Sequence, residues 1–193
     1  LCRAESPIDR AAAYRIQHRC RWSRTGGDTE STLILIKCLR DLGIEEIKMD
    51  LQQEELKELY ETTKQEVIKM GFEKIQKLPI CESRLIRTQF SIMEEICLWA
   101  YWTNDMRITL TIGSQFVTKT LKYGTTPTTG VGFVFFGMAA LQIFKAYEFA
   151  EQIGQVGISL CNNYSGYSES GRARYLYATF LSNWKHPYRR SII

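Results

Sequence analysis

The stretch from Gly124 to Phe144, GTTPTTGVGFVFFGMAALQIF, constrains the fold more than any other part of this chain. It begins with a glycine and a threonine-rich turn, and then continues for about four helical turns without a charged residue. A helix that is apolar all round must be covered by neighbours on more than one side. Gly130, Gly132 and Gly137 lower its helix propensity, so we expect neighbouring helices to approach its backbone closely there. The sequence therefore predicts a central helix packed between other helices.

The rest of the chain predicts further helices joined by short turns. Apolar residues recur at helical spacing, and no segment shows the sustained alternation of a half-buried strand. We expect helices over residues 6–22, 28–42, 52–70, 82–102, 105–123, 128–144, 147–162 and 168–184, a short helical turn within 72–78, and the start of another helix after Pro187. With 193 residues and 45% hydrophobic content, the chain can bury a substantial core. The predicted fold class is all-α.

Short polar residues mark the expected helix starts, because their side chains can accept hydrogen bonds from the free N–H groups of a first turn. The expected N-caps are Ser6, Asp28, either Asn104 or Asp105, and either Ser168 or Ser170. Glycines at 26–27, 43, 71 and 124 are expected to end helices.

A repeat with a period of about 41 residues relates the later helices. Bulky residues recur at expected helix ends, each four residues before a recurring large residue: Trp102 before Met106, Ile143 before Tyr147, and Trp184 before Tyr188. The dipeptides Ile112-Gly113 and Ile153-Gly154 match at the same spacing. Two helices in a period of about 40 residues are typical of an α-solenoid built from antiparallel helix hairpins. An irregular helical bundle is the alternative.

Residues 1–193 are interpreted as one helical-repeat region. It comprises a hairpin over 6–43, an insertion helix over 52–78, and repeats over 82–123, 128–162 and 168–193. The chain begins with Leu1 rather than methionine, and the last expected helix has barely begun at Ile193. We therefore expect this region to be a fragment of a longer chain.

No catalytic or metal-binding constellation accompanies these helices. His18 and His186 have no metal-ligand company at useful spacing, and the GVGF glycines lack the Gly-Lys-Ser/Thr of a phosphate loop. The pair Glu94-Glu95 is expected on the exposed side of its helix, where solvated carboxylates are the norm. We expect no catalytic residue, no metal and no cofactor, and we interpret the chain as a binding or coupling module rather than an enzyme.

The cysteines and the apolar runs bear on the compartment. The six cysteines show no paired spacing, and four of them lie in expected helices, which favours free thiols in a reducing, cytoplasmic setting. The longest nearly apolar run, from Gly130 to Phe144, is shorter than the roughly 20 residues that a membrane-spanning helix needs. We expect no membrane partner.

Charge is unevenly placed along the chain, although the net charge is only +4. The first helix carries five arginines, and the segment after Gly43 is rich in glutamate. We interpret these as solvated faces of opposite sign on neighbouring helices. Nucleic-acid binding through the arginines is a weaker hypothesis, because it would need one basic surface with base-reading side chains. We expect no nucleic-acid partner.

Three pieces of sequence carry a family resemblance: KYGTTPTTGVGF, FKAYEFAEQIGQVGISL and SGRARYLYATFLSNWKHPYR. With SPIDRAAAYRIQHRCRW and CLRDLGI near the start, they make nearly the whole chain similar to the tetratricopeptide-like helical region of fungal multidomain hybrid histidine kinases. The resemblance implies a parent protein with a Ser/Thr kinase-like domain, a P-loop ATPase, this region, a GAF-type sensor, a histidine kinase core and a receiver. The kinase and ATPase motifs lie outside these residues, so no catalytic residue carries over.

The leading hypothesis is a non-catalytic scaffold that couples the ATPase and the sensor–kinase parts of a signalling kinase. Its partners would be other domains of the same polypeptide and a peptide or protein on its concave face. The candidate contact residues are Tyr14, Tyr60, Tyr101, Tyr147 and Tyr175, with half-buried packing as the alternative for each. The second hypothesis is a ligand-sensing or regulatory domain with a pocket between the repeats, near Gly130 and Gly137.

Overall fold

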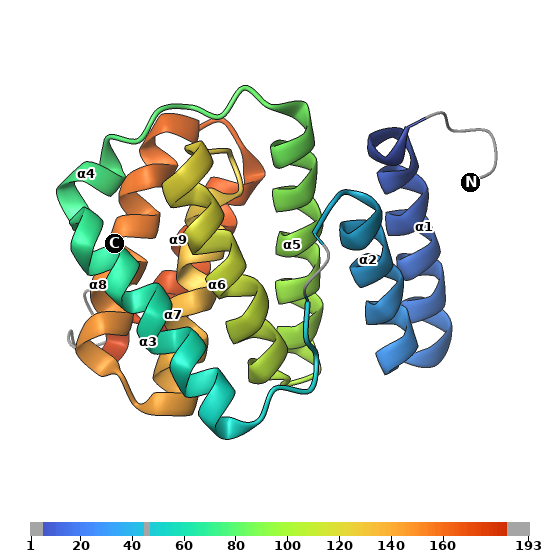
Figure 1. Ribbon diagram of the computed structural model, residues 1–193, viewed down its shortest axis with the longest axis horizontal. Helices are drawn as coiled ribbons and strands as arrows, with labels where there is room; N and C mark the ends of the chain where they lie inside the picture. Colours follow the sequence, from blue (N-terminus) through green and yellow to red (C-terminus); the bar gives the residue numbers. More distant parts are fainter. Residues whose placement is uncertain (1–5, 45–46, 185–193) are drawn as a thin grey trace.

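The computed structural model describes residues 6–44 and 47–184, apart from the side chain of Thr29 (Figure 1). Within these ranges the regular structure is nine α-helices and two 3-10 turns, and no strand forms. In chain order the helices are α1 (Pro7–Thr25), α2 (Thr29–Asp41), α3 (Gln53–Met70), α4 (Phe72–Gln76), α5 (Arg84–Trp102), α6 (Met106–Tyr123), α7 (Thr129–Phe144), α8 (Tyr147–Cys161) and α9 (Ser168–Phe180). The all-α prediction is confirmed. The helix expected after Pro187 lies outside the described residues.

Most of the predicted helix starts are confirmed by the caps. Ser6, Asp28 and Asp105 each accept a hydrogen bond from a backbone N–H in the first turn of α1, α2 and α6 respectively. The prediction for α9 is wrong, because Tyr167 occupies the N-cap position without a side-chain cap. Ser170 instead donates from its hydroxyl to the carbonyl oxygen of Tyr164 at 2.6 Å.

Helix α7 lies at the centre of the molecule, as its sequence predicts. Every residue from Thr129 to Leu141 is buried, with α6 and α8 on two sides and α5 and α9 also in contact. The glycines permit this crowding. A Cβ at Gly132 would collide with the ring of Phe116 in α6, and one at Gly137 would lie 2.9 Å from the carbonyl oxygen of Ala150 in α8.

The helices form a repeat of hairpins. Helices α1 and α2, α5 and α6, and α7 and α8 pair with each other, and α1 and α2 pack together against α5 (Figure 1). The turns within the last two hairpins contain left-handed residues one repeat period apart, Asn104 with φ 57° and Lys145 with φ 55°.

The contacts between successive hairpins repeat at the same spacing. Gly113 of α6 lies against Phe136 of α7, and Gly154 of α8 lies against the ring of Tyr177 in α9. Each glycine and each aromatic residue is thus one repeat period away from its counterpart. The fold is a helical repeat, and one packing contact is used twice.

Helices α3 and α4 interrupt the hairpin pattern and lie across the later helices. Helix α3 packs on α6, and α4 packs on α8. Tyr60 of α3 stacks on Phe144, with ring centroids 4.7 Å apart, and meets the edge of Phe149 at 5.9 Å. The insertion between the first two hairpins therefore covers part of α6, α7 and α8.

The expectation that Glu94 and Glu95 lie on an exposed side of their helix is wrong. Both are buried in α5, with exposed fractions of 5% and 4%. Glu94 pairs with Arg172 of α9, and Glu95 pairs with Arg15 and Arg19 of α1. Helices from both ends of the repeat cover α5 and supply arginines, so the two carboxylates are removed from water without losing charged partners.

The described cysteines are free thiols, and all except Cys20 are buried. This agrees with their expected role as small apolar side chains. In the described part of the chain, none of the helices combines the length and apolar character that crossing a bilayer requires.

Candidate functional site: an aromatic groove

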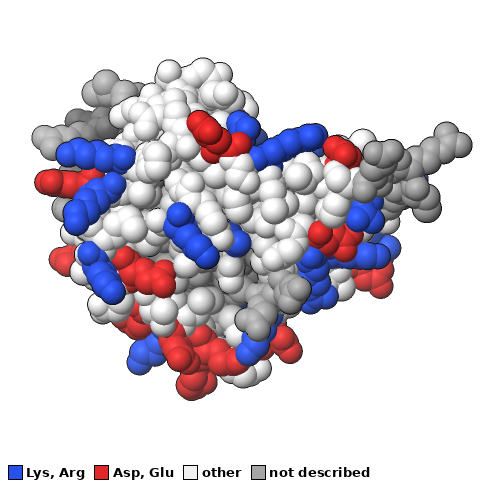
Figure 2. Space-filling view, turned by 45° about the horizontal axis from the view of Figure 1, so that its top comes forward, with Lys and Arg blue, Asp and Glu red and all other residues white. Residues whose placement is uncertain are grey.

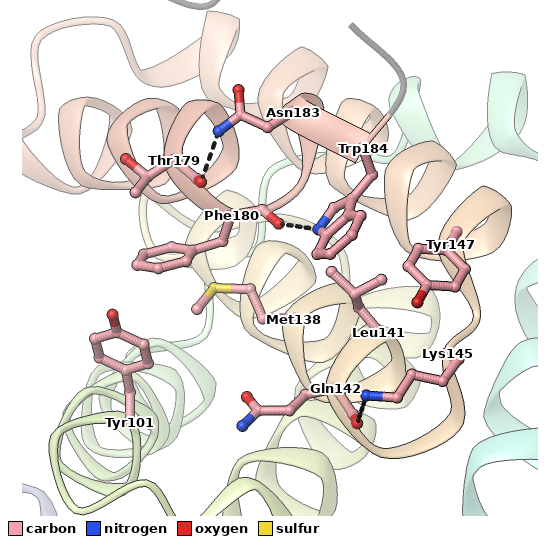
Figure 3. Close-up of a pocket in the computed structure, with 10 residues that line it drawn as sticks. All are labelled: Tyr101, Met138, Leu141, Gln142, Lys145, Tyr147, Thr179, Phe180, Asn183 and Trp184. Atoms are coloured by element: carbon pink, nitrogen blue, oxygen red, sulfur yellow. Dashed lines mark hydrogen bonds between the residues drawn. The ribbon is translucent and has the colours of Figure 1, made fainter. Parts of the chain in front are cut away.

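A groove of about 440 Å³ opens where the C-terminal ends of α5, α7 and α9 meet the turn into α8 (Figure 3). We call it the aromatic groove. Its lining residues are Tyr101, Met138, Leu141, Gln142, Lys145, Tyr147, Thr179, Phe180, Asn183 and Trp184.

The aromatic groove is a product of the repeat. Tyr101, Gln142 and Asn183 line it, and each stands one repeat period after the one before. Met138 and Thr179 form a second pair of lining residues at that spacing. The C-terminal ends of α5, α7 and α9, each the first helix of its repeat unit, therefore face one hollow. A repeat array produces such shared concave surfaces by stacking equivalent positions side by side.

Aromatic rings stand on both sides of the hollow. Tyr101 meets Phe180 edge to face at 5.3 Å, and Tyr147 lies 5.1 Å from Trp184. Figure 3 shows Met138 and Leu141 between these two pairs. Trp184 is 62% exposed, and its indole N–H donates to the carbonyl oxygen of Phe180 at 3.1 Å. This bond fixes the ring at the rim.

Polar groups line the same hollow. The Lys145 ammonium donates to the carbonyl oxygen of Gln142 at 3.2 Å, and the Asn183 amide donates to that of Thr179 at 2.9 Å. Among the described residues that line the groove, only Lys145 carries a full charge at neutral pH. A peptide could be bound here through apolar contacts and hydrogen bonds to carboxamides.

Two of the five predicted tyrosines, Tyr101 and Tyr147, lie in the aromatic groove. Tyr175 is exposed on α9 outside it. Tyr14 is buried and donates to Asp41 at 2.7 Å; this hydrogen bond, with burial, raises its pKa to about 12. Burial raises the pKa of Tyr60 to about 12 as well. Tyr14 and Tyr60 therefore serve packing in this structure.

The surface remains hollowed beyond the aromatic groove. Tyr147 and Trp184 also border a hollow of about 450 Å³ beside Glu148 and Glu151 of α8. Tyr147 borders a third, of about 630 Å³, that reaches Tyr60 and other residues of α3. Further concave surface therefore lies beside Tyr147.

Sequence reasoning named Tyr101 and Tyr147 of this lining and missed the other residues, Met138, Gln142 and Asn183 among them. A signal was present for Gln142 and Asn183, because they stand one and two repeat periods after Tyr101. Applying the repeat spacing to every aromatic candidate would have placed all three helix ends on one surface.

The pocket expected beside Gly130 and Gly137 does not coincide with the aromatic groove, because neighbouring helices fill the space beside both glycines. A Cβ on Gly130 would lie 2.6 Å from the carbonyl oxygen of Gly157, and Ala150 and Ile153 fill the space beside Gly137. The glycines serve close helix packing, and the aromatic groove lies along the following part of α7.

Other candidate chemistry is explained by packing. His18 is buried beside the rings of Trp22 and Trp99, with Nδ1 2.7 Å from the carbonyl oxygen of Ser31, and burial lowers its pKa. Among the described residues, no group of three metal-binding side chains is close enough to hold an ion.

The arginines of α1 are largely engaged by carboxylates. Arg15 and Arg19 bind Glu95, and Arg21 binds Asp28 and Glu30. On the face drawn in Figure 2, basic and acidic side chains are interspersed rather than gathered in one basic surface.

Comparisons with protein-family models, with curated proteins and with solved structures found no match.

Proposed function

We propose that this chain is a non-catalytic helical-repeat scaffold that binds a segment of a partner in the aromatic groove. The observation that carries the proposal is the convergence of Tyr101, Gln142 and Asn183, from three successive repeat units, on one hollow rimmed by Tyr147 and Trp184. Exposed aromatic side chains beside a concave apolar floor are the usual anchors of protein–protein contacts.

The proposal includes a role in a larger protein. From its resemblance to the helical region of hybrid histidine kinases, we propose that the chain couples an ATPase to a sensor–kinase part in a phosphorelay protein. Stacked hairpins suit this role, since each contacts mainly its neighbours and both ends stay available. The coding sequence on either side of this region tests it: kinase and ATPase motifs are expected there, and flanking sequences without them would contradict the coupling role.

Binding in the aromatic groove is tested by selecting peptides from a phage-displayed random library on the whole chain. We expect the enriched peptides to bind at least about tenfold more weakly to Trp184→Ala and to Tyr147→Ala, because both rings are exposed anchors. Fluorescence anisotropy with labelled peptides provides the measurement.

Tyr123→Ala is the matched control, because Tyr123 is also an exposed tyrosine and lies outside the aromatic groove, at the end of α6. Its affinity for the peptides should equal that of the unmodified chain. Peptides that bind all three variants equally well would place the binding surface elsewhere and end the proposal.

A second candidate function, small-ligand sensing, is favoured by the size of the groove. A volume of about 440 Å³ lies within the roughly 300–1,000 Å³ of small-molecule sites. A ligand bound there should raise the melting temperature of the chain, and Met138→Gln should reduce that rise. A compound screen in which no thermal shift depends on Met138 would count against this candidate.

A further inference from the structure

His18 lies at the joint between the first hairpin and the rest of the molecule. Helices α1 and α2 pack on each other, and in the described residues they meet the later helices mainly through α5. The His18 ring belongs to α1, contacts the carbonyl oxygen of Ser31 in α2, and lies beside the ring of Trp99 in α5, with ring centroids 5.3 Å apart. One imidazole therefore contacts all three helices of the joint.

The surroundings of this ring determine which of its nitrogens carries a proton. The His18 side chain is 0% exposed. Nδ1 lies 2.7 Å from the Ser31 carbonyl oxygen, and because that oxygen can only accept, Nδ1 carries the hydrogen of the neutral ring. Nε2 is also buried, and it has no hydrogen-bond partner among the described residues. A second proton, which would bind at Nε2, would thus be buried without a protein acceptor.

The charged groups near the ring do not reverse this preference for the neutral form. Burial is the main cause that lowers the pKa of His18, and the positive charge of Arg19 on α1 lowers it further. The Ser31 carbonyl of α2 and the Glu95 carboxylate of α5 raise that pKa, but by less. Glu95 is already paired with Arg15 and Arg19. The folded joint therefore binds a proton at His18 less readily than the unfolded chain does.

We propose that His18 makes this joint sensitive to pH, so that its protonation releases the first hairpin from α5 while α6, α7 and α8 stay folded. A charged imidazole is costly to bury without a hydrogen-bond acceptor, and separating α1 from α5 lets water solvate it. The proposal adds regulation by pH to the scaffold. It does not depend on the aromatic groove, because neither His18 nor the residues that contact it line that groove.

Acidification should weaken the joint below about pH 6.5. Because the pKa of His18 is lower in the folded chain than its ordinary value of 6.5, the stability that the neutral ring gives is complete above that pH and is lost as pH falls below it. Glu94 acts with the opposite sign, since its pKa is raised, and its partner Arg172 lies on α9 rather than in the first hairpin. A measurement that resolves individual helices separates the two effects.

Hydrogen exchange of the whole chain at pH 7.5 and pH 5.5, corrected for the intrinsic exchange rate at each pH, tests the proposal. Protection of α1 and α2 should fall by about threefold to tenfold on acidification, while α8 keeps its protection. His18→Phe puts a ring that binds no proton in the same place, so it should abolish this pH dependence. His186→Gln is the matched control, because it removes the other histidine, which lies outside the described residues, and should leave the pH dependence intact.

Nuclear magnetic resonance gives a second result that does not require His18→Phe to fold. In the His186→Gln variant His18 is the only histidine, so its ring proton signals titrate alone. A midpoint below pH 6.5 would support the proposal, and a midpoint at or above pH 6.5 would overturn it. Equal loss of protection in α1, α2 and α8 would also overturn it, because the whole molecule would then be opening. So would a pH dependence of α1 and α2 that persists in His18→Phe.

Discussion

At the scale of single residues, the adjacent carboxylates Glu94 and Glu95 of α5 are unusual because they are buried, whereas glutamate side chains normally lie at the surface. Glu94 forms an ion pair with an arginine of α9, and Glu95 forms ion pairs with two arginines of α1. Two adjacent residues of α5 therefore connect it to both α1 and α9. Burial raises the pKa of Glu94 to about 7, even though Arg172 opposes the shift. The cost of removing the ionised carboxylate from water therefore exceeds its attraction to the arginine.

This shift predicts a pH dependence. Because the pKa of Glu94 is higher in the folded chain than its ordinary value, its contribution to stability is complete below about pH 4.5 and is lost as pH rises to about 7. Glu94→Gln should remove this loss and raise the unfolding free energy at pH 8 by on the order of 1–3 kcal/mol. Urea unfolding at pH 5 and pH 8 measures the effect.

The control for that experiment is Glu148→Gln, an exposed glutamate on α8. Its stability should stay within about 0.5 kcal/mol of the unmodified chain at both pH values. A Glu94→Gln variant that is less stable at pH 8 would show that the ion pair with Arg172 outweighs the desolvation of the carboxylate.

Neither carboxylate's environment could be predicted from the sequence. Periodicity marks Glu94 and Glu95 as the polar interruption between two apolar stripes, and such residues usually face water. Their partners stand far away in the chain, at Arg15, Arg19 and Arg172. No local pattern records that α1 and α9 approach α5 from different sides.

At the scale of elements, the glycines of α7 and α9 offer a paired test of the repeat. Gly130→Ala should destabilise the chain by about 2 kcal/mol, because its Cβ would meet the backbone of α8 and force the helices apart. Gly171→Ala, at the equivalent position of α9, should stabilise it by up to about 1 kcal/mol through helix propensity alone. Thermal unfolding of both variants measures the difference in their stability. Equal changes in the melting temperature of the two variants would contradict the prediction.

The left-handed turn at the end of α7 gives a further prediction. Lys145 has φ 55°, a conformation that costs a residue with a side chain about 1 kcal/mol relative to glycine. Lys145→Gly should therefore raise stability by up to that amount. Lys77→Gly serves for comparison, because Lys77 ends α4 with φ −101° and gains no such relief. Chemical denaturation of the two variants should move the midpoints in opposite directions or move only the first.

Element type and burial were accessible from the sequence where one segment contains the whole signal. The uninterrupted apolar run of α7 predicts a covered helix, and Ser6 and Asp28 predict helix starts that the structure confirms. The prediction of the N-cap of α9 was wrong, because the Ser170 hydroxyl donates to the carbonyl oxygen of Tyr164 instead of accepting from a backbone N–H in the first turn of α9. Which hydrogen-bond partner such a hydroxyl takes depends on the conformation of the loop before the helix rather than on the residue type.

At the scale of the whole molecule, the first hairpin is the least embedded part of the repeat. Helices α1 and α2 pack on each other and on α5, whereas α7 is surrounded (Figure 1). Arg15→Ala combined with Arg19→Ala would leave Glu95 buried without its partners, at a cost on the order of 1–3 kcal/mol because both arginines are partly exposed. Hydrogen exchange should then quicken about tenfold or more in α1 and α2 while α8 keeps its protection.

Lys37→Ala, an exposed substitution on α2, should leave exchange in the first hairpin unchanged. Uniform acceleration of exchange in α1, α2 and α8 by the double arginine variant would show that the molecule unfolds as one cooperative unit. It would also contradict the picture of hairpins that open separately.

The repeat was predicted from the spacing of Trp102, Ile143 and Trp184, and the helical-repeat fold is confirmed. The aromatic groove was found only in small part, since Tyr101 and Tyr147 were named but residues such as Gln142 and Asn183 were not. Where α3 lies could not be predicted, because an amphipathic helix shows which side is buried and not which neighbour buries it.

The position of α3 has a mechanical consequence. An array of stacked hairpins alone behaves as a spring, since small rotations between units add along its length. Here α3 packs on α6 and α4 packs on α8 from outside, whereas the described residues of the first hairpin meet the later helices mainly at the joint with α5. A force applied to the first hairpin would therefore bend the molecule at that joint, and the helices from α3 onward would move together as a rigid body.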